Sequence, residues 1–183
     1  MPCIFVGIAS FRDPEIQATV DALFAHAAHP ERIHVGICLQ VDPKQDAACI
    51  VRPKGYPGKL RIEQVHHTDS QGAGWARHRA QQLWDGENYI LAIDSHMRFE
   101  SGWDKALIDM LSRCPPRSLL STYVPRYTPP DTRDRFPGQI LRIRVHGMAE
   151  EGNPQTLHIT KVPVPLTDKE RSGLYRAPFA IAN

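Results

Sequence analysis

Two side chains that can bind a metal ion, those of Asp94 and His96, stand at the end of the apolar run YILAID. In an extended segment residues i and i+2 point the same way, so this carboxylate and imidazole could converge on one cation. Oxygen and nitrogen ligands together suit manganese or zinc, and magnesium less well. The simpler alternative is that Asp94 caps a turn and His96 is a surface histidine. The end of a buried strand favours the metal site, because α/β sheets bind ligands beyond the carboxyl ends of their strands.

A second candidate is the stretch Gly72-Ala73-Gly74, which comes just before a predicted helix that carries Arg77. Glycines at a helix N-terminus let backbone N–H groups approach anionic oxygen, and an arginine can bind a phosphate with two parallel hydrogen bonds. The alternative is an ordinary turn followed by a surface arginine. The stretch matches neither the Walker A pattern nor the dinucleotide-binding fingerprint.

Ser10, Arg12 and Asp13 follow the first apolar run and should lie on the same sheet edge as Asp94. Arg12 could contact a nucleotide, whereas Asp13 is interpreted as the cap of the next helix. Further along, Asp104 is interpreted as a helix cap or dipole partner.

Residues 124–139 form a loop rich in proline and arginine, with seven arginines between Arg113 and Arg144 offset by Asp131 and Asp134. The loop is either a solvated connection or a lid that contacts the acceptor over an anionic donor.

Other chemistries have little support in this sequence. The four cysteines have no metal-binding spacing and are interpreted as reduced, partly buried thiols of a cytoplasmic protein: Cys3, Cys38, Cys49 and Cys114. The nine histidines form no zinc-protease motif, and His66 and His67 are expected on opposite faces of a strand. No G-x-S-x-G motif indicates a hydrolytic nucleophile.

Hydrophobic periodicity predicts an α/β domain. We predict strands at 3–9, 33–41, 59–67, 89–94 and 118–124, and helices at 12–30, 73–84 and 102–114. The run 89–94 is unalternated, as expected of a central parallel strand covered on both faces. The segments 140–147 and 156–164 alternate like antiparallel strands. The order predicts a three-layer α/β/α arrangement with a mixed central sheet.

The bulk properties restrict the partners. A net charge of +2 over 183 residues is too small to indicate a nucleic-acid-binding surface. No apolar run approaches the length of about 18 residues that a membrane span needs, and the first residues lack the basic start of a signal peptide. The expected location is therefore the cytoplasm.

Two longer stretches resemble a known family of glycosyltransferases. IFVGIASFRDPEIQATVDALFAHAAHPERIHVGICLQ is similar to the opening segment of enzymes that transfer N-acetylglucosamine from UDP-GlcNAc to polypeptide hydroxyls. GAGWARHRAQQLWDGENYILAIDSHMRFESGWDKALIDML resembles their central block, and SLLSTYVP resembles the strand that follows. The family includes the enzyme that modifies hydroxyproline on Skp1, and the resemblance spans residues 4–125.

The resemblance implies a GT-A fold and a donor site. Asp94 and His96 would take the place of the D-x-D element and bind a divalent metal, most simply manganese, with magnesium as the alternative. Ser10 and Arg12 would lie against the uridine, Arg77 would hold the nucleotide, and Ser95 would face the ribose or the sugar.

The resemblance also sets an expectation about the later part of the chain. We treat 1–183 as one glycosyltransferase domain, with the nucleotide-sugar-binding part at 1–123 and the start of the acceptor side at 124–183. Members of the family continue further, with an acidic motif and a metal-binding histidine, so the chain is expected to be a truncated form with no identified catalytic residue. An unfinished sheet edge suggests a homodimer.

Three functions remain open at this point. The first is a metal-dependent transferase that moves N-acetylglucosamine from UDP-GlcNAc to a hydroxyl of a protein or glycan. The second is a non-catalytic module that binds a UDP-sugar. The third is a metal-dependent phosphohydrolase, which would need more carboxylates at strand ends than the sequence offers.

Overall fold

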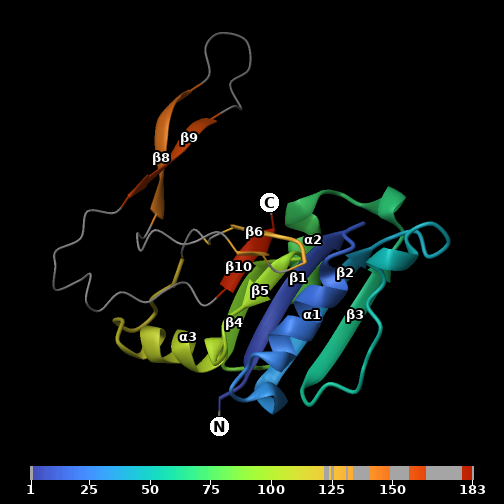
Figure 1. The fold of residues 1–183 in the computed structure, drawn as a ribbon, viewed down its shortest axis with the longest axis horizontal. Coiled ribbons are helices and arrows are strands. Elements are labelled where there is room, and N and C mark those ends of the chain that lie inside the picture. The colour runs from blue at the N-terminus through green and yellow to red at the C-terminus, as the bar shows by residue number, and fades with distance from the viewer. Residues whose placement is uncertain are drawn as a thin grey trace.

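The computed structural model describes residues 2–121, 124, 126–130, 132–133, 141–148, 157–163 and 179–182. Its centre is a sheet of four parallel strands in the order β3-β2-β1-β4 (Figure 1). These strands are β1 (Ile4–Phe11), β2 (Ile33–Gln40), β3 (Lys59–Val65) and β4 (Tyr89–Asp94). Ile4 pairs with both Ile33 and Tyr89, so the neighbouring strands start in step. Their carboxyl ends therefore meet along one edge.

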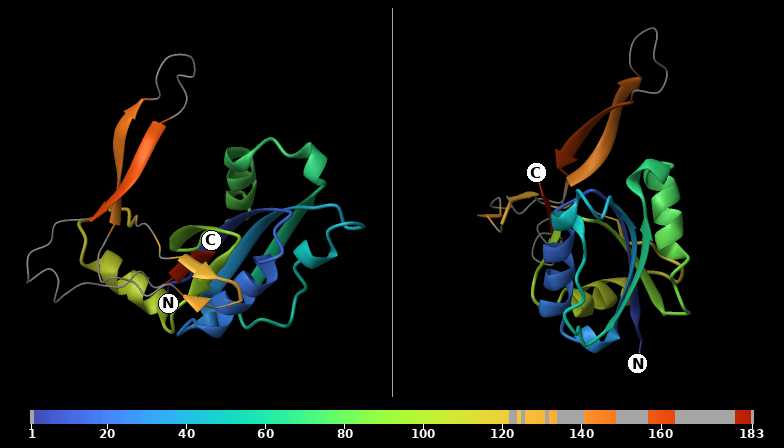
Figure 2. Two further views of the ribbon diagram at one scale, coloured as in Figure 1. Left: turned by 45° about the horizontal axis from the view of Figure 1, so that its top comes forward. Right: turned by 90° about the vertical axis from the view of Figure 1, so that its right-hand side faces the viewer.

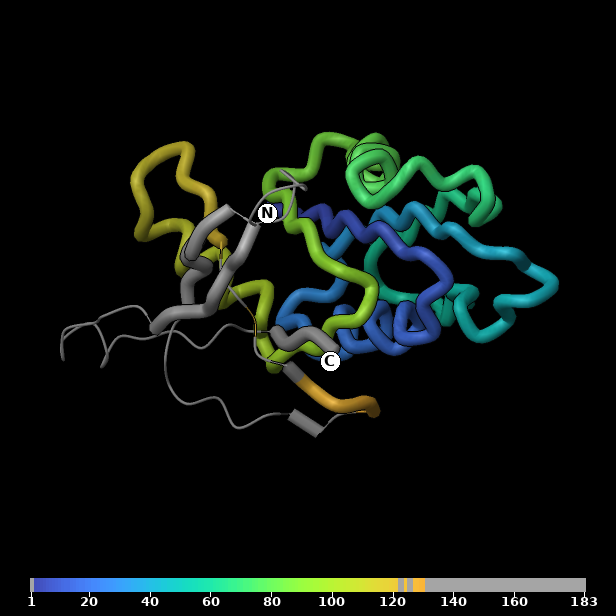
Figure 3. Tube along the Cα trace, turned by 90° about the horizontal axis from the view of Figure 1, so that it is seen from above, coloured from blue at the N-terminus to red at the C-terminus, as the bar shows by residue number. Residues whose placement is uncertain are grey.

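Helices cover both faces of this sheet, as the three-layer prediction required (Figures 2 and 3). Helix α1 (Ile16–Ala25) buries a stripe of side chains at helical spacing: Ile16, Thr19, Val20, Leu23 and Phe24. The apolar members pack against Val6 and Ile8 of β1 in the main core, together with Trp103 of α3 (Trp103–Ser112). Helix α2 (Ala73–Gln81) packs Ala76 and Ala80 against the opposite face, beside Cys38.

Three short 3₁₀ turns complete this part: η1 (Pro30–Arg32), η2 (Ala47–Cys49) and η3 (His67–Asp69). All four cysteines are free thiols, and Cys38 and Cys49 are buried. None of the helices in the described residues has the length and apolarity that crossing a membrane would require.

Two predictions about the sheet were wrong. Strand β4 is an edge strand of the described sheet, not a central one, and its Ile90 side chain is 58% exposed. Residues 118–121, predicted to be a strand, are not in one, and neither is Val124, while 122–123 lie outside the described residues. An extended segment becomes a strand only when its backbone pairs with a neighbour, and apolar composition alone does not supply one.

A second sheet carries the mixed pairing that was predicted for the central one. It has the order β5-β10-β6-β7, formed by Met97–Phe99, Phe179–Ala182, Arg126–Thr128 and Thr132–Arg133. Strand β10 runs antiparallel to β5 and parallel to β6. The predicted loop at 124–139 therefore contains two short strands. The antiparallel pair β8 (Leu141–Met148) and β9 (Leu157–Pro163) confirms the antiparallel strands predicted at 140–147 and 156–164.

Arg98 fastens β5 and β6 to the first helix. Its guanidinium Nη2 donates to Glu15 Oε2 at 2.6 Å and to the Pro130 carbonyl at 3.1 Å. The same guanidinium lies 4.6 Å from the centre of the Tyr127 ring, and the Tyr127 hydroxyl donates to Glu15 Oε2 at 3.1 Å. Arg98 and Tyr127 are buried, so this cation–π and ion-pair network works in a water-poor setting where both interactions are strengthened.

Asp104 is also structural, although it does not cap its own helix. Its two carboxylate oxygens accept the backbone N–H groups of Ala28 and His29 at 2.7 and 2.9 Å. It thus holds the chain segment that leaves α1. Gly102, with a φ of 74°, occupies the N-cap of α3.

A buried carboxylate, that of Glu87, joins three chain segments at the opposite side of the sheet from the core. Arg61 Nη1 donates to Glu87 Oε1 at 3.0 Å, the Asp85 backbone N–H donates to Oε2 at 2.7 Å, and His34 Nδ1 lies 2.7 Å from Oε1. Burial raises the pKa of Glu87, but these hydrogen bonds outweigh it and lower the pKa to about 2 from the usual 4.5.

We expect Glu87→Gln to lower the free energy of unfolding by about 3 kcal/mol at neutral pH. Because the folded-state pKa is depressed, the stabilisation is present above roughly pH 5 and is lost as the pH falls toward about 2. The difference between wild type and variant should therefore shrink across that window in urea titrations. Asp85→Asn is the control, since Asp85 also contacts Arg61 but its side chain is 73% exposed. Equal losses in both variants would contradict the assignment.

Candidate functional site at the carboxyl edge of the sheet

The polar residues singled out in the sequence gather at the carboxyl edge of the parallel sheet. Asp94 is the last residue of β4 and pairs with Ala9 of β1. The segment Ser10–Asp13 follows one residue later on the neighbouring strand, and helix α2 contacts β1 and β2. The loops after β1 and β4 and the start of α2 thus approach one another.

Arg77 and Asp94 form an ion pair. The Arg77 Nη2 atom donates to Asp94 Oδ1 at 3.0 Å, and the two side chains are 57% and 42% exposed. Gly72 precedes α2 with a φ of 94°, a left-handed conformation that favours glycine, and it serves as the N-cap. The structure therefore joins two sequence candidates, the glycine-led helix and the end of β4, that were separate in the sequence.

The prediction that Asp94 and His96 lie in one extended segment was wrong, because the strand ends at Asp94. Ser95 and His96 form a bend between β4 and β5, and both turn toward Asp13. Ser95 Oγ donates to Asp13 Oδ2 at 2.5 Å, and His96 Nδ1 lies 2.7 Å from the same oxygen. An ionised carboxylate only accepts hydrogen bonds, so Nδ1 must carry a hydrogen and neutral His96 keeps its lone pair on Nε2.

Asp13 is the site residue whose role the sequence did not indicate. Its expected function as a helix cap is present in part, since Oδ1 accepts the Glu15 backbone N–H at 2.9 Å. Burial raises the pKa of Asp13, but hydrogen bonds from His96 and Ser95 outweigh it and lower the pKa below its usual value. The hydrogen bond to Asp13 in turn raises the pKa of His96. Each group thus favours the charged form of the other.

Thr19 of α1 holds the bend that carries Ser95 and His96. The Thr19 hydroxyl donates to the Ser95 carbonyl at 2.8 Å and accepts the Met97 backbone N–H at 2.9 Å. All three residues are buried, so these bonds satisfy backbone groups that water does not reach. A helix side chain thereby fixes the backbone on which Asp94 and His96 stand.

The first strand places its two predicted residues differently. Arg12 has a φ of 48°, unusual for a residue other than glycine, and its guanidinium binds Asp46 through Nε and Nη2 at 3.1 and 2.8 Å. Ser10 is fully buried, and its hydroxyl has no hydrogen-bond partner among the described residues. Arg12 is thus at the edge, whereas Ser10 lies beneath it.

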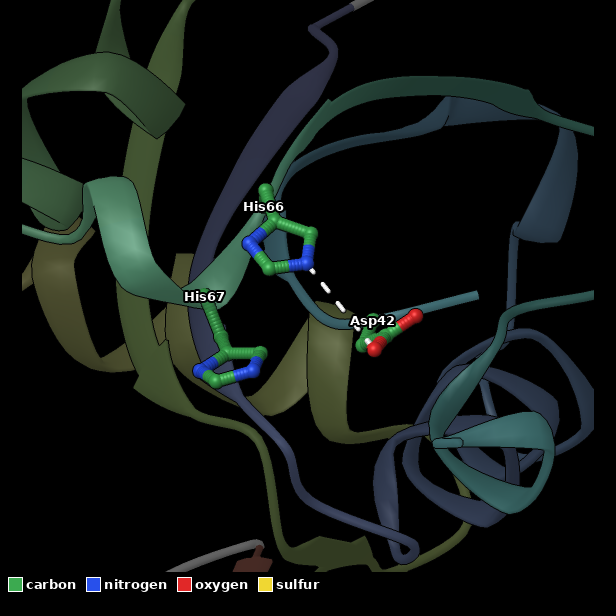
Figure 4. Close-up of side chains that lie close together, drawn as sticks. All are labelled: Asp42, His66 and His67. Atoms are coloured by element: carbon green, nitrogen blue, oxygen red, sulfur yellow. Dashed lines mark ion pairs between the residues drawn. The ribbon is translucent and has the colours of Figure 1, made fainter. Parts of the chain in front are cut away.

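The prediction for His66 and His67 was wrong. Strand β3 ends at Val65, and the chain turns at once into η3, so the two rings do not alternate across a strand. They stack with centroids 4.8 Å apart and an interplanar angle of 29° (Figure 4). Asp42, in the loop after β2, lies beside them, with Oδ2 3.9 Å from His66 Nε2. In the sequence, the only sign that these three side chains meet is that they follow the neighbouring strands β2 and β3.

The donor set of Asp94 and His96 fits a divalent cation. Asp94 offers a half-exposed carboxylate, and His96 offers Nε2 while its other nitrogen is held by Asp13. Histidines that bind metals characteristically donate their second ring N–H to a carboxylate. The residues present are therefore compatible with the metal that the sequence suggested.

One comparison with known protein families gives a match. A family model described as glycosyltransferase (GlcNAc) matches residues 3–60 and 56–143, which together span more than half of the chain. The matched ranges include β1 to β4 and all the residues of the Arg77–Asp94 and Asp13–His96 contacts. A comparison with curated proteins gave no match. The chain belongs to the glycosyltransferase (GlcNAc) family.

Proposed function

We propose that the chain binds UDP-GlcNAc with a divalent cation, manganese first, and transfers N-acetylglucosamine to a hydroxyl of a protein or glycan. Family membership supports transfer of a sugar. The proposal includes a GT-A fold, with which the parallel sheet covered on both faces is compatible. The acceptor class follows the resemblance to enzymes that modify polypeptide hydroxyls, hydroxyproline among them.

The observation that carries the proposal is the Arg77–Asp94 ion pair at the carboxyl edge of the sheet. A guanidinium that could bind a diphosphate is held against a carboxylate that could bind a divalent cation. In the free chain the two groups neutralise each other. When a diphosphate and its cation bind, the guanidinium can pair with the diphosphate and the carboxylate with the cation. No charge is then left uncompensated.

Each residue then has a defined role. Asp94 and His96 Nε2 would hold the cation, and when bound it would supply positive charge that neutralises the departing UDP. Arg77 contacts the diphosphate, and the N-terminus of α2 adds backbone N–H groups. Asp13 holds His96 in the tautomer that leaves Nε2 free. Arg12 contacts the nucleoside, and the Ser95 hydroxyl helps to hold the Asp13 carboxylate in place.

The test is calorimetric titration of the chain with UDP-GlcNAc, with and without manganese. We expect one site that requires the cation and that GDP-mannose does not fill. Transfer is followed in parallel as radiolabel moving onto a hydroxyproline peptide, with hydrolysis of the donor as the second readout. A folded sample that gives no manganese-dependent heat with UDP-GlcNAc would contradict the proposal.

A non-catalytic UDP-sugar-binding module is the second candidate, because none of the described residues at this edge stands out as a catalytic base. Manganese-dependent binding without transfer or hydrolysis would favour the module over the enzyme. Neither the transferase nor the binding module would release phosphate from simple esters. Such release would instead support the phosphohydrolase.

We predict that Arg77→Ala acts on the two ligands in opposite directions. Manganese alone should bind about 2- to 5-fold more tightly, because Asp94 loses a competing cation worth up to about 1 kcal/mol in an exposed pair. UDP-GlcNAc at saturating manganese should bind roughly 10- to 100-fold more weakly, because its diphosphate loses charge-assisted hydrogen bonds. Calorimetry on Arg79→Ala provides the control, since Arg79 lies on the same helix but pairs with Glu63. Similar behaviour of the two variants would exclude a specific role for Arg77.

A further inference from the structure

A second group of metal-binding side chains lies at the other end of the same edge. Asp42, His66 and His67 each offer a ligand atom, and these atoms all lie within 4.8 Å of one another (Figure 4). The three residues follow β2 and β3, whereas Asp94 ends β4 and His96 follows it, on the far side of β1. The group is therefore separate from the proposed donor site.

The ligand types point to a transition metal. Two imidazoles and one carboxylate are the set found in His₂-carboxylate zinc sites, which keep a further position open. Magnesium and calcium prefer oxygen ligands and would find only one here. Bond lengths of about 2.1 Å in a tetrahedral site place the ligand atoms roughly 3.4 Å apart. Ligand atoms that lie up to 4.8 Å apart must therefore approach by up to about 1.4 Å, which side-chain rotations can supply.

Hydrogen bonds orient two of the three ligands. His66 Nδ1 lies 2.7 Å from Thr68 Oγ1 and accepts the Thr68 backbone N–H at 3.4 Å, and Nε2 faces Asp42. For Nε2 to bind a cation, the ring hydrogen must move to Nδ1, which would then donate to Thr68 Oγ1. Asp42 Oδ1 accepts the Lys44 backbone N–H at 2.9 Å, which leaves Oδ2 facing His66. The 3.9 Å between Nε2 and Oδ2 is too long for a hydrogen bond. A cation between them would give both atoms a partner.

The local charge also suits a divalent cation. Arg12, which follows β1, is bound to Asp46 through two of its nitrogens. That pair is neutral as a whole, so the charge of Asp42 is not cancelled by it. Since Asp42 is only 14% exposed, its charge is partly shielded from water and the attraction for a bound cation is strengthened.

We propose that Asp42, His66 and His67 form a transition-metal site, with zinc as the best match, that is distinct from Asp94 and His96. The metal would clamp the ends of β2 and β3 together. The proposal does not depend on the glycosyltransferase activity, because its test measures the metal alone.

Zinc titration of the full chain by calorimetry tests the site, and Co²⁺ serves as the spectroscopic probe. We expect one zinc per chain that still binds in Asp94→Asn, visible cobalt bands typical of nitrogen and oxygen ligands, and no thiolate-to-cobalt band. His66→Ala, His67→Ala and Asp42→Asn should each weaken zinc binding by at least about 10-fold. His78→Ala, an exposed histidine on α2, and Asp94→Asn should leave it unchanged.

Zinc-induced thermal stabilisation separates loss of the site from loss of the fold. Wild type should show a higher Tm with zinc, whereas each cluster variant should unfold cooperatively at a Tm that zinc does not change. Unchanged zinc affinity in all three cluster variants would overturn the proposal. Loss of zinc binding in Asp94→Asn, or a cobalt–thiolate band, would also overturn it by assigning the metal to other residues.

Discussion

Asp94→Asn is expected to weaken the manganese-dependent binding of UDP-GlcNAc by more than about 100-fold. The substitution replaces a charged metal ligand by a neutral amide at the end of β4. It also removes the negative charge that balances the Arg77 guanidinium, even if the amide oxygen keeps the hydrogen bond, so a positive charge then repels the incoming cation. Both effects act in the same direction, which is why this variant should have the largest effect on the donor.

Calorimetry with and without manganese measures the effect, and Asp109→Asn on the exposed face of α3 provides the matched control. Because Asp94 is half-exposed and its pair with Arg77 is an exposed ion pair, Asp94→Asn should change the free energy of unfolding by less than about 1 kcal/mol. Metal-dependent binding that survives in a folded Asp94→Asn sample would mean that the cation is held elsewhere.

Much of the central layer could be predicted because it depends on local pattern. The runs that form β1 and β2 are continuous and apolar, α1 repeats its apolar residues at helical spacing, and a parallel pair needs a crossover such as this helix. Because the strands are parallel, their carboxyl ends must lie along one edge of the sheet. The meeting of Arg77 with the end of β4 follows from that topology.

The parts that could not be predicted depend on pairings between distant segments. Asp13 and His96 are 83 positions apart, and nothing in their spacing shows that the bend after β4 folds back onto the loop after β1. Whether residues 118–121 form a strand depends on whether another strand pairs with their backbone. The stacking of His66 and His67 depends on where β3 ends, and a difference of two residues turns an alternating pair into a facing one.

We further predict that Asp13→Asn impairs metal binding by His96 more than Asp13→Ala does. The asparagine Oδ1 can keep the hydrogen bond to the Glu15 N–H, which places its NH₂ group where Oδ2 now faces Ser95 and His96. An NH₂ group donates hydrogen bonds, so it favours the His96 tautomer with a bare Nδ1 and a hydrogen on Nε2. If the amide rotated by 180°, its NH₂ group would face the Glu15 N–H, and two hydrogen-bond donors would then oppose each other. Alanine removes the orienting bond but imposes no tautomer.

Manganese affinity should therefore fall about 10-fold in Asp13→Ala and up to roughly 100-fold in Asp13→Asn. The ¹⁵N chemical shifts of the His96 ring report the tautomer directly, with Nε2 carrying the hydrogen in Asp13→Asn and Nδ1 carrying it in wild type. Asp85→Asn, which changes an exposed carboxylate in the same way, should alter neither quantity. If alanine proved the more damaging substitution while the shifts stayed as in wild type, Asp13 would act by holding the bend in place rather than by selecting the tautomer of His96.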